Sequence, residues 1–197
     1  VGTISDCVSL LGENRLIVKQ GLAYINEKPR LGLKALMDVA KVEVGNVTEW
    51  SIGWQITPRL NVAGRLDHAN TAYKLLATHS PEEAKALAEE LNNKNVERQG
   101  MTEAIVTACA DIAATEQADE KILIMIAPDI LEGGEPWSEG IIGLVAGRLA
   151  ERFSKPCFVI CQSEGKIKGS GRSIEQYVLG ASLEHGTWFA RSAVVVQ

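Results

Sequence analysis

The spacing of apolar residues predicts helices in the first part of the chain and a mixed α/β layer in the second. After Asp6 the chain reads as helical. A further amphipathic helix, opened by Pro29 and Gly32, is indicated by four residues at i, i+3, i+4, i+7 spacing: Leu33, Leu36, Met37 and Ala40. Pro58 and Gly64 then predict a break within TPRLNVAGRL. Another helix should follow this break, through Ala72, Leu75 and Leu76.

The segment SPEE at residues 80–83 predicts the start of a long helix. Ser80 suits the N-cap, Pro81 the first helical position, and Glu83 the return partner of a capping box. Before about Thr115 only Gly100 would bend or split this helix. Two apolar stripes are predicted on it, Ala84–Leu87–Leu91 and Ile105–Ala108–Cys109–Ile112. At about 1.5 Å per residue it would span roughly 50 Å, which suits a connector between two lobes.

After Asp119 the pattern changes to short apolar runs. KILIMIAP at 121–128 is typical of a buried strand. IIGLVAGRLAERF predicts a helix, PCFVICQ a second strand and KIKGSGRS a third. A strand, a helix and a strand joined by short loops predict an α/β layer.

Composition is ordinary for a soluble globular protein, with 46% apolar residues, 23% charged residues and a net charge of −5. No apolar run approaches the roughly 18 residues of a membrane span, and the start does not read as a signal peptide. Val1 falls inside what reads as structured sequence, so we expect the chain to begin within a longer protein. The scattered cysteines fit a reducing cytoplasm, and Cys157 and Cys161 are predicted to be core thiols.

Positive charge gathers between residues 148 and 172, although the chain as a whole is acidic. The acidic side chains in this range are Glu151 and Glu164, and the basic ones are Arg148, Arg152, Lys155, Lys166, Lys168 and Arg172. Such a patch suits one anionic strand. Random clustering on a solvated surface explains it equally well.

Three segments carry groups suited to phosphate. TPRLNVAGRLDHA (57–69) holds two arginines and an asparagine around a predicted constrained loop. PWSEGIIGLVAGRL (136–149) places a Trp and glycines at a helix start that favours anions, with Arg148 further inside. KGSGRS (168–173) combines glycines with several donors. The structural alternatives are a surface loop with ion pairs, a glycine-rich helix packed on a strand, and a β-turn.

The remaining candidate groups give weaker signals. Trp50, Trp54, Trp137 and Trp188 would suit base stacking, but the four-residue spacing of Trp50 and Trp54 favours core packing. The three histidines lack metal-ligand spacing and are expected at the surface or at caps: His68, His79 and His185. On residue chemistry alone, Asp6 is better explained as a helix cap than as a metal ligand.

Five of these segments, in their order, resemble the RecJ family of single-stranded-DNA exonucleases, within the DHH phosphoesterase superfamily. GTISDCVSLLGENRLIVKQGL resembles the end of the family's DHH catalytic domain. TPRLNVAGRLDHA resembles its PR-[IL]-N-A-A-G-R-L segment, with Val62 replacing the first Ala, and NNKNVERQ resembles part of its connecting helix. PWSEGIIGLVAGRLAERFSKPCFVI and KGSGRS resemble two segments of its DHH-associated domain. The resemblance covers residues 1 to about 183.

The resemblance implies an α/β fragment in three parts. These are the helical C-terminal edge of a DHH domain at 1–79, a connector helix at 80–118, and an incomplete DHH-associated domain at 119–197. Asp6 would be the last carboxylate of a two-metal site for Mn²⁺ or Mg²⁺. The resemblance makes Arg65, Gln99, Arg148 and Arg172 candidates for binding the substrate strand. The chemistry of KGSGRS adds Lys168, Gly169, Ser170, Gly171 and Ser173 to the candidate nucleic-acid-binding residues.

The implied activity is hydrolysis of single-stranded DNA from its 5′ end, in DNA repair and recombination. Repair or replication proteins are possible partners, and no membrane is involved. Because the family's Asp-His-His motif is missing, the chain itself is expected to bind strands without cleaving them. The tail HGTWFARSAVVVQ fits the family poorly and receives no role. The alternatives are a phosphodiesterase of dinucleotides or short oligonucleotides, which the long helix disfavours, and a non-catalytic DNA-binding or scaffold relative.

Overall fold

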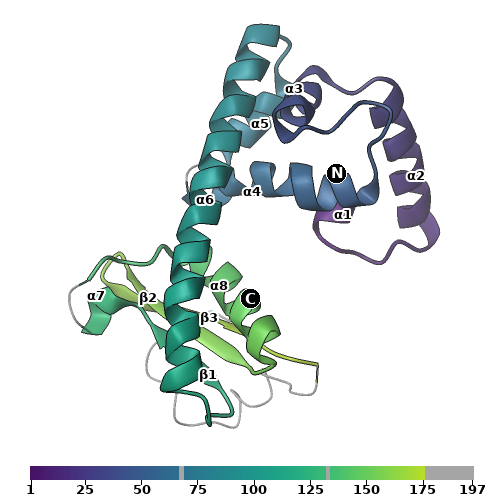
Figure 1. Cartoon of the computed structure of the whole chain (residues 1–197). Coiled ribbons are helices and arrows are strands. Elements are labelled where there is room, and N and C mark those ends of the chain that lie inside the picture. Colours follow the sequence, from purple (N-terminus) through teal and green to yellow (C-terminus); the bar gives the residue numbers. More distant parts are fainter. Residues whose placement is uncertain (67–68, 132–133, 176–197) are drawn as a thin grey trace. The chain divides into compact units, whose positions relative to one another are not determined.

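The chain folds into two compact units, residues 1–98 and 99–197, in a computed structural model that describes residues 1–66, 69–131 and 134–175. The first unit is helical, and the second holds a three-stranded sheet (Figure 1). The predicted fold class, helices followed by an α/β layer, is confirmed. None of the helices in the described ranges combines the length and apolarity that a membrane crossing needs.

The first unit is built from short helices joined by tight loops. Its elements are α1 (Gly2–Ser5), α2 (Gly12–Glu27), α3 (Leu31–Ala40), the π-helical η1 (Ser51–Ile56), α4 (Thr57–Leu66), α5 (Asn70–Ala77) and the start of α6 (Pro81–Thr115). The helices predicted after Asp6, around Leu36 and around Leu75 are therefore confirmed. Asn26 ties α2 to the loop before η1, since its side-chain amide accepts from the Val47 N–H and donates to the Val47 carbonyl.

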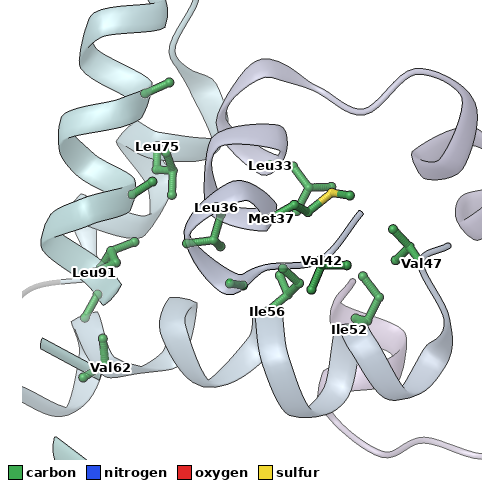
Figure 2. Close-up of a cluster of buried hydrophobic side chains, with 14 residues drawn as sticks. Leu33, Leu36, Met37, Val42, Val47, Ile52, Ile56, Val62, Leu75 and Leu91 are labelled. Atoms are coloured by element: carbon green, nitrogen blue, oxygen red, sulfur yellow. The ribbon is translucent and has the colours of Figure 1, made fainter. Parts of the chain in front are cut away.

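The core of the first unit forms around α3. All four predicted apolar positions of this helix are buried. Side chains from η1, α4, α5 and α6 join them, including Ile52, Ile56, Val62, Leu75 and Leu91 (Figure 2). Close approach of α3 to α5 depends on Gly32, because a Cβ there would lie 1.7 Å from the Leu75 carbonyl oxygen.

The predicted break at Pro58 and Gly64 is wrong. Thr57–Leu66 forms one α-helix, which continues directly from η1. Pro58 is its second residue, and the first turn of an α-helix tolerates a missing N–H. Gly64 is exposed, and a glycine in a helix interior costs only about 1 kcal/mol relative to alanine. TPRLNVAGRL is therefore a helix and not a loop.

Core packing of Trp50 and Trp54 is also a wrong prediction. Their exposed fractions are 62% and 71%. The buried residues here are Ser51, Ile52 and Ile56. Ile52 and Ile56 are four residues apart, as are Trp50 and Trp54, so a spacing of four marks a shared face but does not say which face is buried.

The predicted long helix is confirmed as α6, which runs unbroken through Gly100. Ser80 acts as its N-cap, because its Oγ accepts from the Glu83 N–H at 3.2 Å. The capping box is not formed as predicted. The Glu83 carboxylate instead accepts from the Thr78 hydroxyl, and the Thr78 oxygen accepts from the Ser80 N–H. The Thr78 hydroxyl thus lies between the Ser80 N–H and the Glu83 carboxylate, which a capping box would join directly.

The second unit is a small mixed sheet with α8 against one face. Its elements after α6 are β1 (Leu123–Ile126), α7 (Pro128–Leu131), α8 (Glu139–Phe153), β2 (Cys157–Ser163) and β3 (Lys166–Arg172), in the strand order β1-β2-β3. β1 and β2 are parallel, and β2 and β3 are antiparallel. Gln117 pairs with the backbone N–H and carbonyl of Ile124 on the edge strand β1, at 2.9 and 2.8 Å.

The stretch of α6 within the second unit buries a different stripe from the predicted one. Ala108 is exposed, and the buried residues include Thr102, Val106, Cys109 and Ala113. They follow an i, i+4, i+7, i+11 spacing, so the stripe is displaced around the helix. The predicted core thiols are confirmed, since the three thiols of this unit, Cys109, Cys157 and Cys161, are all fully buried.

Candidate nucleic-acid interface

The segment KGSGRS lies mostly in a strand, as predicted, and the alternative of a β-turn is wrong. Lys168 to Arg172 belong to β3, and Ser173 follows it. The turn of the hairpin is Glu164–Gly165 instead, where φ is +52° and +71°. Two successive positive φ values suit the type I′ turn that connects antiparallel strands. The segment therefore presents its donors from an extended backbone.

Alternation along β3 places Lys168, Ser170 and Arg172 on the face of the sheet that α8 covers. Their register partners on β2 are Cys161, Val159 and Cys157, all of which are buried. Directly opposed residues of an antiparallel pair point to the same face. The structure thus brings together three donor side chains that the sequence placed two residues apart.

Two glycines of α8 make room for this row of side chains. A Cβ at Gly143 would lie 3.1 Å from the Ser170 Oγ and 3.4 Å from the Arg172 Nη2. A Cβ at Gly147, one turn later, would lie 3.9 Å from the Arg172 Cγ. The half-buried Arg172 side chain therefore runs along a strip of α8 that lacks side chains. The spacing of four between these glycines was readable in the sequence, but its link to Arg172 was not.

Arg148 is exposed on α8 and forms an ion pair with Glu103 of α6, with Nη1 and Oε2 2.5 Å apart. Gln99 is exposed on α6 and precedes Glu103 by four residues. Residues four apart lie on the same face of an α-helix, one turn from each other. Gln99 and Arg148 therefore lie in one neighbourhood of the second unit, with Glu103 between them.

Two of the site's cations have acidic partners that the sequence count did not include. Lys168 donates to the carboxylate of Glu139, in the first turn of α8, and Arg148 pairs with Glu103. The hydrogen bond from Lys168 lowers the pKa of the Glu139 carboxyl. The positive excess predicted for residues 148–172 is therefore partly neutralised, because Glu103 and Glu139 lie outside that range of sequence.

Two side chains of the segments 57–69 and 92–99 have structural roles in the first unit. The Arg59 Nε donates to the Asn92 Oδ1 at 3.0 Å, and its Nη1 donates to the Gln55 carbonyl at 2.6 Å. Asn95 is buried and accepts from Arg98 at 3.1 Å. The alternative of structural contacts is thus correct for Arg59. Arg65 lies in α4, with its side chain outside the part that the structure describes.

The candidate metal ligand Asp6 is exposed at the end of α1, where its N–H donates to the Gly2 carbonyl. Within residues 1–66, 69–131 and 134–175, no group of three or more His, Cys, Asp or Glu side chains is placed to hold a metal ion. A carboxylate oxygen suits Mg²⁺ or Mn²⁺. One such ligand does not make a two-metal site, so the described residues fit at most one corner of it.

Some of the other candidates lie outside the described residues. These are His68, His185, Trp188 and the tail after Leu183. His79 is exposed, as predicted, and Trp137 is half-buried just before α8.

Comparisons with known proteins point to one class, exonucleases specific for single-stranded DNA. No protein-family model matches the chain. It is 36% identical over 185 residues to the single-stranded-DNA-specific exonuclease RecJ of Bacillus subtilis, and 34% identical over 190 residues to that of Escherichia coli. Each match covers 93% of the chain. The resemblance to the RecJ exonucleases, predicted from the motifs, is confirmed over nearly the whole sequence.

Solved structures give the same result. The structure of RecJ from Thermus thermophilus in complex with Mg²⁺ matches with a TM-score of 0.77 and 33% identity, over 93% of this chain and 27% of that one. A structure of exonuclease RecJ bound to manganese matches with a TM-score of 0.74 and 32% identity, over 93% of this chain and 43% of that one. The chain spans 23% of the Bacillus subtilis relative and 32% of the Escherichia coli relative.

Proposed function

We propose that this chain is the strand-binding part of a divalent-metal-dependent exonuclease that hydrolyses single-stranded DNA from the 5′ end. The observation that carries the proposal is the row of Lys168, Ser170 and Arg172 on one face of β3, beside the glycine strip of α8. The similarity of nearly the whole chain to part of single-stranded-DNA-specific exonucleases supports the choice of substrate.

The chemistry of the β3 row suits a phosphate backbone. A guanidinium group presents N–H donors in a fork that matches phosphate oxygens. The Ser170 hydroxyl adds a neutral donor. Such contacts hold a strand in place without reading its sequence. Sequence-independent binding is what an exonuclease requires, because each nucleotide removed brings a new one into the site.

A second cluster, Arg148 with Gln99, would extend the strand's path across α8 and α6. Glu103 lies between them and holds Arg148 while no strand is bound. A phosphate would compete with Glu103 for the same guanidinium group. Strand binding at this point would therefore be weakened by salt and strengthened when Glu103 is neutralised.

For the metal, Asp6 is the described residue that would contribute a ligand. Two divalent ions, when bound, activate a water molecule and neutralise charge on the scissile phosphate. One carboxylate oxygen pair cannot hold two such ions. We therefore propose that the chain by itself binds single strands and does not hydrolyse them.

The test is a fluorescence-anisotropy titration of the 197-residue chain with a labelled single-stranded oligonucleotide. The Arg172→Ala variant should bind roughly fivefold to tenfold more weakly, as expected for the loss of one charge-assisted contact. Its slope of log affinity against log salt should fall by about 0.7. The matched control is Arg152→Ala, which removes the same charge from α8 outside the candidate set, where Arg152 lies over the Phe153 ring. Equal weakening by both variants would mean that binding follows net charge alone, and the β3 row would lose its assignment.

A further inference from the structure

The first unit contains a cleft that the proposed strand path does not use. It has a volume of about 620 Å³ and lies where α2 and α5 end and α3 begins. Ligand sites in proteins commonly measure about 300–1,000 Å³. Its polar lining includes Tyr24, Lys28, Arg30 and His79. All four are described side chains of one unit, so the cleft is defined within that unit alone.

The lining of this cleft is unusual in charge for a protein of net charge −5. It contains two permanent cations, Lys28 and Arg30, and no carboxylate. Among the described residues neither cation has an acidic partner. One carboxylate, that of Glu83, contacts the lining, where it accepts from the Thr78 hydroxyl at the start of α6. An anionic ligand would supply the countercharge that the fold leaves out.

A neighbouring groove of the same unit provides the contrast. It has a volume of about 400 Å³, and its charged lining residues are Lys34, Lys85, Asp38 and Glu89. Lys85 lies 4.0 Å from Glu89, so cations and carboxylates are balanced there. The excess of positive charge is therefore specific to the cleft of Tyr24, Lys28 and Arg30.

The helix dipole favours a positive charge at only one of the two cations, Lys28. Lys28 follows the last residue of α2, where a positive charge is favoured by the helix dipole. Arg30 occupies the N-cap of α3, where a positive charge is disfavoured, and its side chain makes no capping hydrogen bond. Arg30 thus has a position that the stability of the fold does not explain.

Tyr24 narrows the class of ligand. Its ring belongs to the last turn of α2, lines the cleft and is 55% exposed. An exposed aromatic ring next to cations is the combination that binds single-stranded nucleic acid, with the base stacked and the phosphate paired. We propose that this cleft binds one nucleotide of the single strand, as a second contact separate from the β3 row. The proposal rests on the proposed function for its choice of polymer, and on the cleft for its location.

The first experiment maps the contact directly. The 197-residue chain is irradiated with an oligothymidylate in which one base is 5-iodouracil, and the crosslinked peptides are identified by mass spectrometry. We expect a crosslink at Tyr24, which Tyr24→Ala removes while circular dichroism shows an intact helical fold. Crosslinks confined to the second unit would overturn the proposal. Loss of the Tyr24 crosslink on adding thymidine monophosphate, at concentrations that leave the oligonucleotide bound elsewhere, would assign the cleft to a free nucleotide and overturn it as a strand contact.

The second experiment separates this proposal from the β3 assignment. Replacement of both Lys28 and Arg30 by Gln should weaken oligonucleotide binding roughly fivefold to tenfold and lower the salt slope by about 1.4, for two lost phosphate contacts. The matched control is replacement of Lys34 and Lys85 by Gln, which removes the same charge from the balanced groove and should change neither quantity. If Arg172→Ala weakens binding and the Lys28–Arg30 variant does not, the cleft proposal fails and the β3 assignment stands. The reverse result would retain the cleft and reject the β3 row.

Discussion

The glycine strip of α8 gives the sharpest test of how the fold holds Arg172. Gly143 and Gly147 are both half-buried in the interior of α8 and face the same row of β3 side chains. Replacing either by alanine should favour the helix by about 1 kcal/mol, because glycine loses more backbone freedom on folding. The two substitutions differ in what the new methyl group meets.

At Gly143 the methyl group would lie 3.1 Å from the Ser170 Oγ and 3.4 Å from the Arg172 Nη2. Comfortable contacts between heavy atoms begin near about 3.5 Å, so both groups must move by a few tenths of an ångström. Both atoms are ends of side chains, which can move without unfolding the sheet. This movement offsets part of the gain in helix stability. It also displaces the Arg172 guanidinium from its position beside α8. A displaced charge-assisted contact should cost binding about 0.7–1.4 kcal/mol, or roughly threefold to tenfold in Kd.

At Gly147 the methyl group would lie 3.9 Å from the Arg172 Cγ, an ordinary van der Waals distance. Gly147→Ala should therefore raise the free energy of unfolding by about 1 kcal/mol and leave strand binding unchanged. The assays are thermal unfolding by circular dichroism and the anisotropy titration. Equal strand affinity for Gly143→Ala and Gly147→Ala would refute the reasoning, since binding would then not depend on where α8 holds Arg172.

Three further outcomes are expected. Gly32→Ala should destabilise the first unit by about 2–3 kcal/mol in chemical denaturation, because its methyl group would lie 1.7 Å from the Leu75 carbonyl oxygen and the helices must separate; an unchanged midpoint would contradict this. Glu139→Gln should tighten strand binding about twofold to threefold by releasing Lys168, with little change in thermal stability because the pair is exposed, whereas weaker binding would assign Lys168 a purely structural role. Burial raises the pKa of the Cys157 thiol from about 9 to about 12, so the folded state should be fully stabilised below pH 9 and lose stability as pH rises from 9 to 12; this thiol should also resist alkylation at neutral pH until the chain is unfolded.

The parts of the fold that the sequence predicted are those where one local rule decides the structure. The stripe on α3 is an α-helical pattern and is buried as one. Ser80 and Pro81 mark the start of α6 through local hydrogen bonding and a fixed φ angle. The apolar run that contains the strand Leu123–Ile126 is short and ends at Lys121 and Pro128, so it is too short for a typical helix.

The wrong predictions arise where the same residue pattern fits two local structures. Trp50 and Trp54 share one helical face, as their spacing of four predicts, but that face is exposed and Ile52 and Ile56 form the buried one. Pro58 reads as a breaker, but it sits in the first turn of α4 and is tolerated there. Residue types alone decide neither case. Trp50 and Trp54 would suit a buried or an exposed helix face, and Pro58 would suit a loop or the first turn of a helix.

The segments of the candidate site were chosen from the sequence, but the charges that surround them could not be predicted from it. Glu103 is 45 residues from Arg148, and Glu139 is 29 residues from Lys168, so a count within one window of sequence omits both. The fold brings these carboxylates to the cations. Arg148 and Lys168 are therefore paired within the fold, and a phosphate that bound either one would have to displace a carboxylate.

That exchange bears on how a strand would move through such a site. A phosphate that replaces Glu103 or Glu139 gains little net Coulomb energy, because one negative partner is exchanged for another in an exposed setting. Each such contact is weak and reversible. Such a contact would suit repeated release of the strand, and it would leave tighter holding to Arg172, whose side chain runs along the glycine strip of α8. We therefore expect Arg172 to contribute the larger part of the affinity, and Glu103 and Glu139 to weaken binding modestly by speeding dissociation of the strand. Stopped-flow dissociation of a labelled oligonucleotide from the Glu103→Gln and Glu139→Gln variants should therefore be slower than from the unaltered chain, and unchanged rates would show that the carboxylates do not compete with the strand.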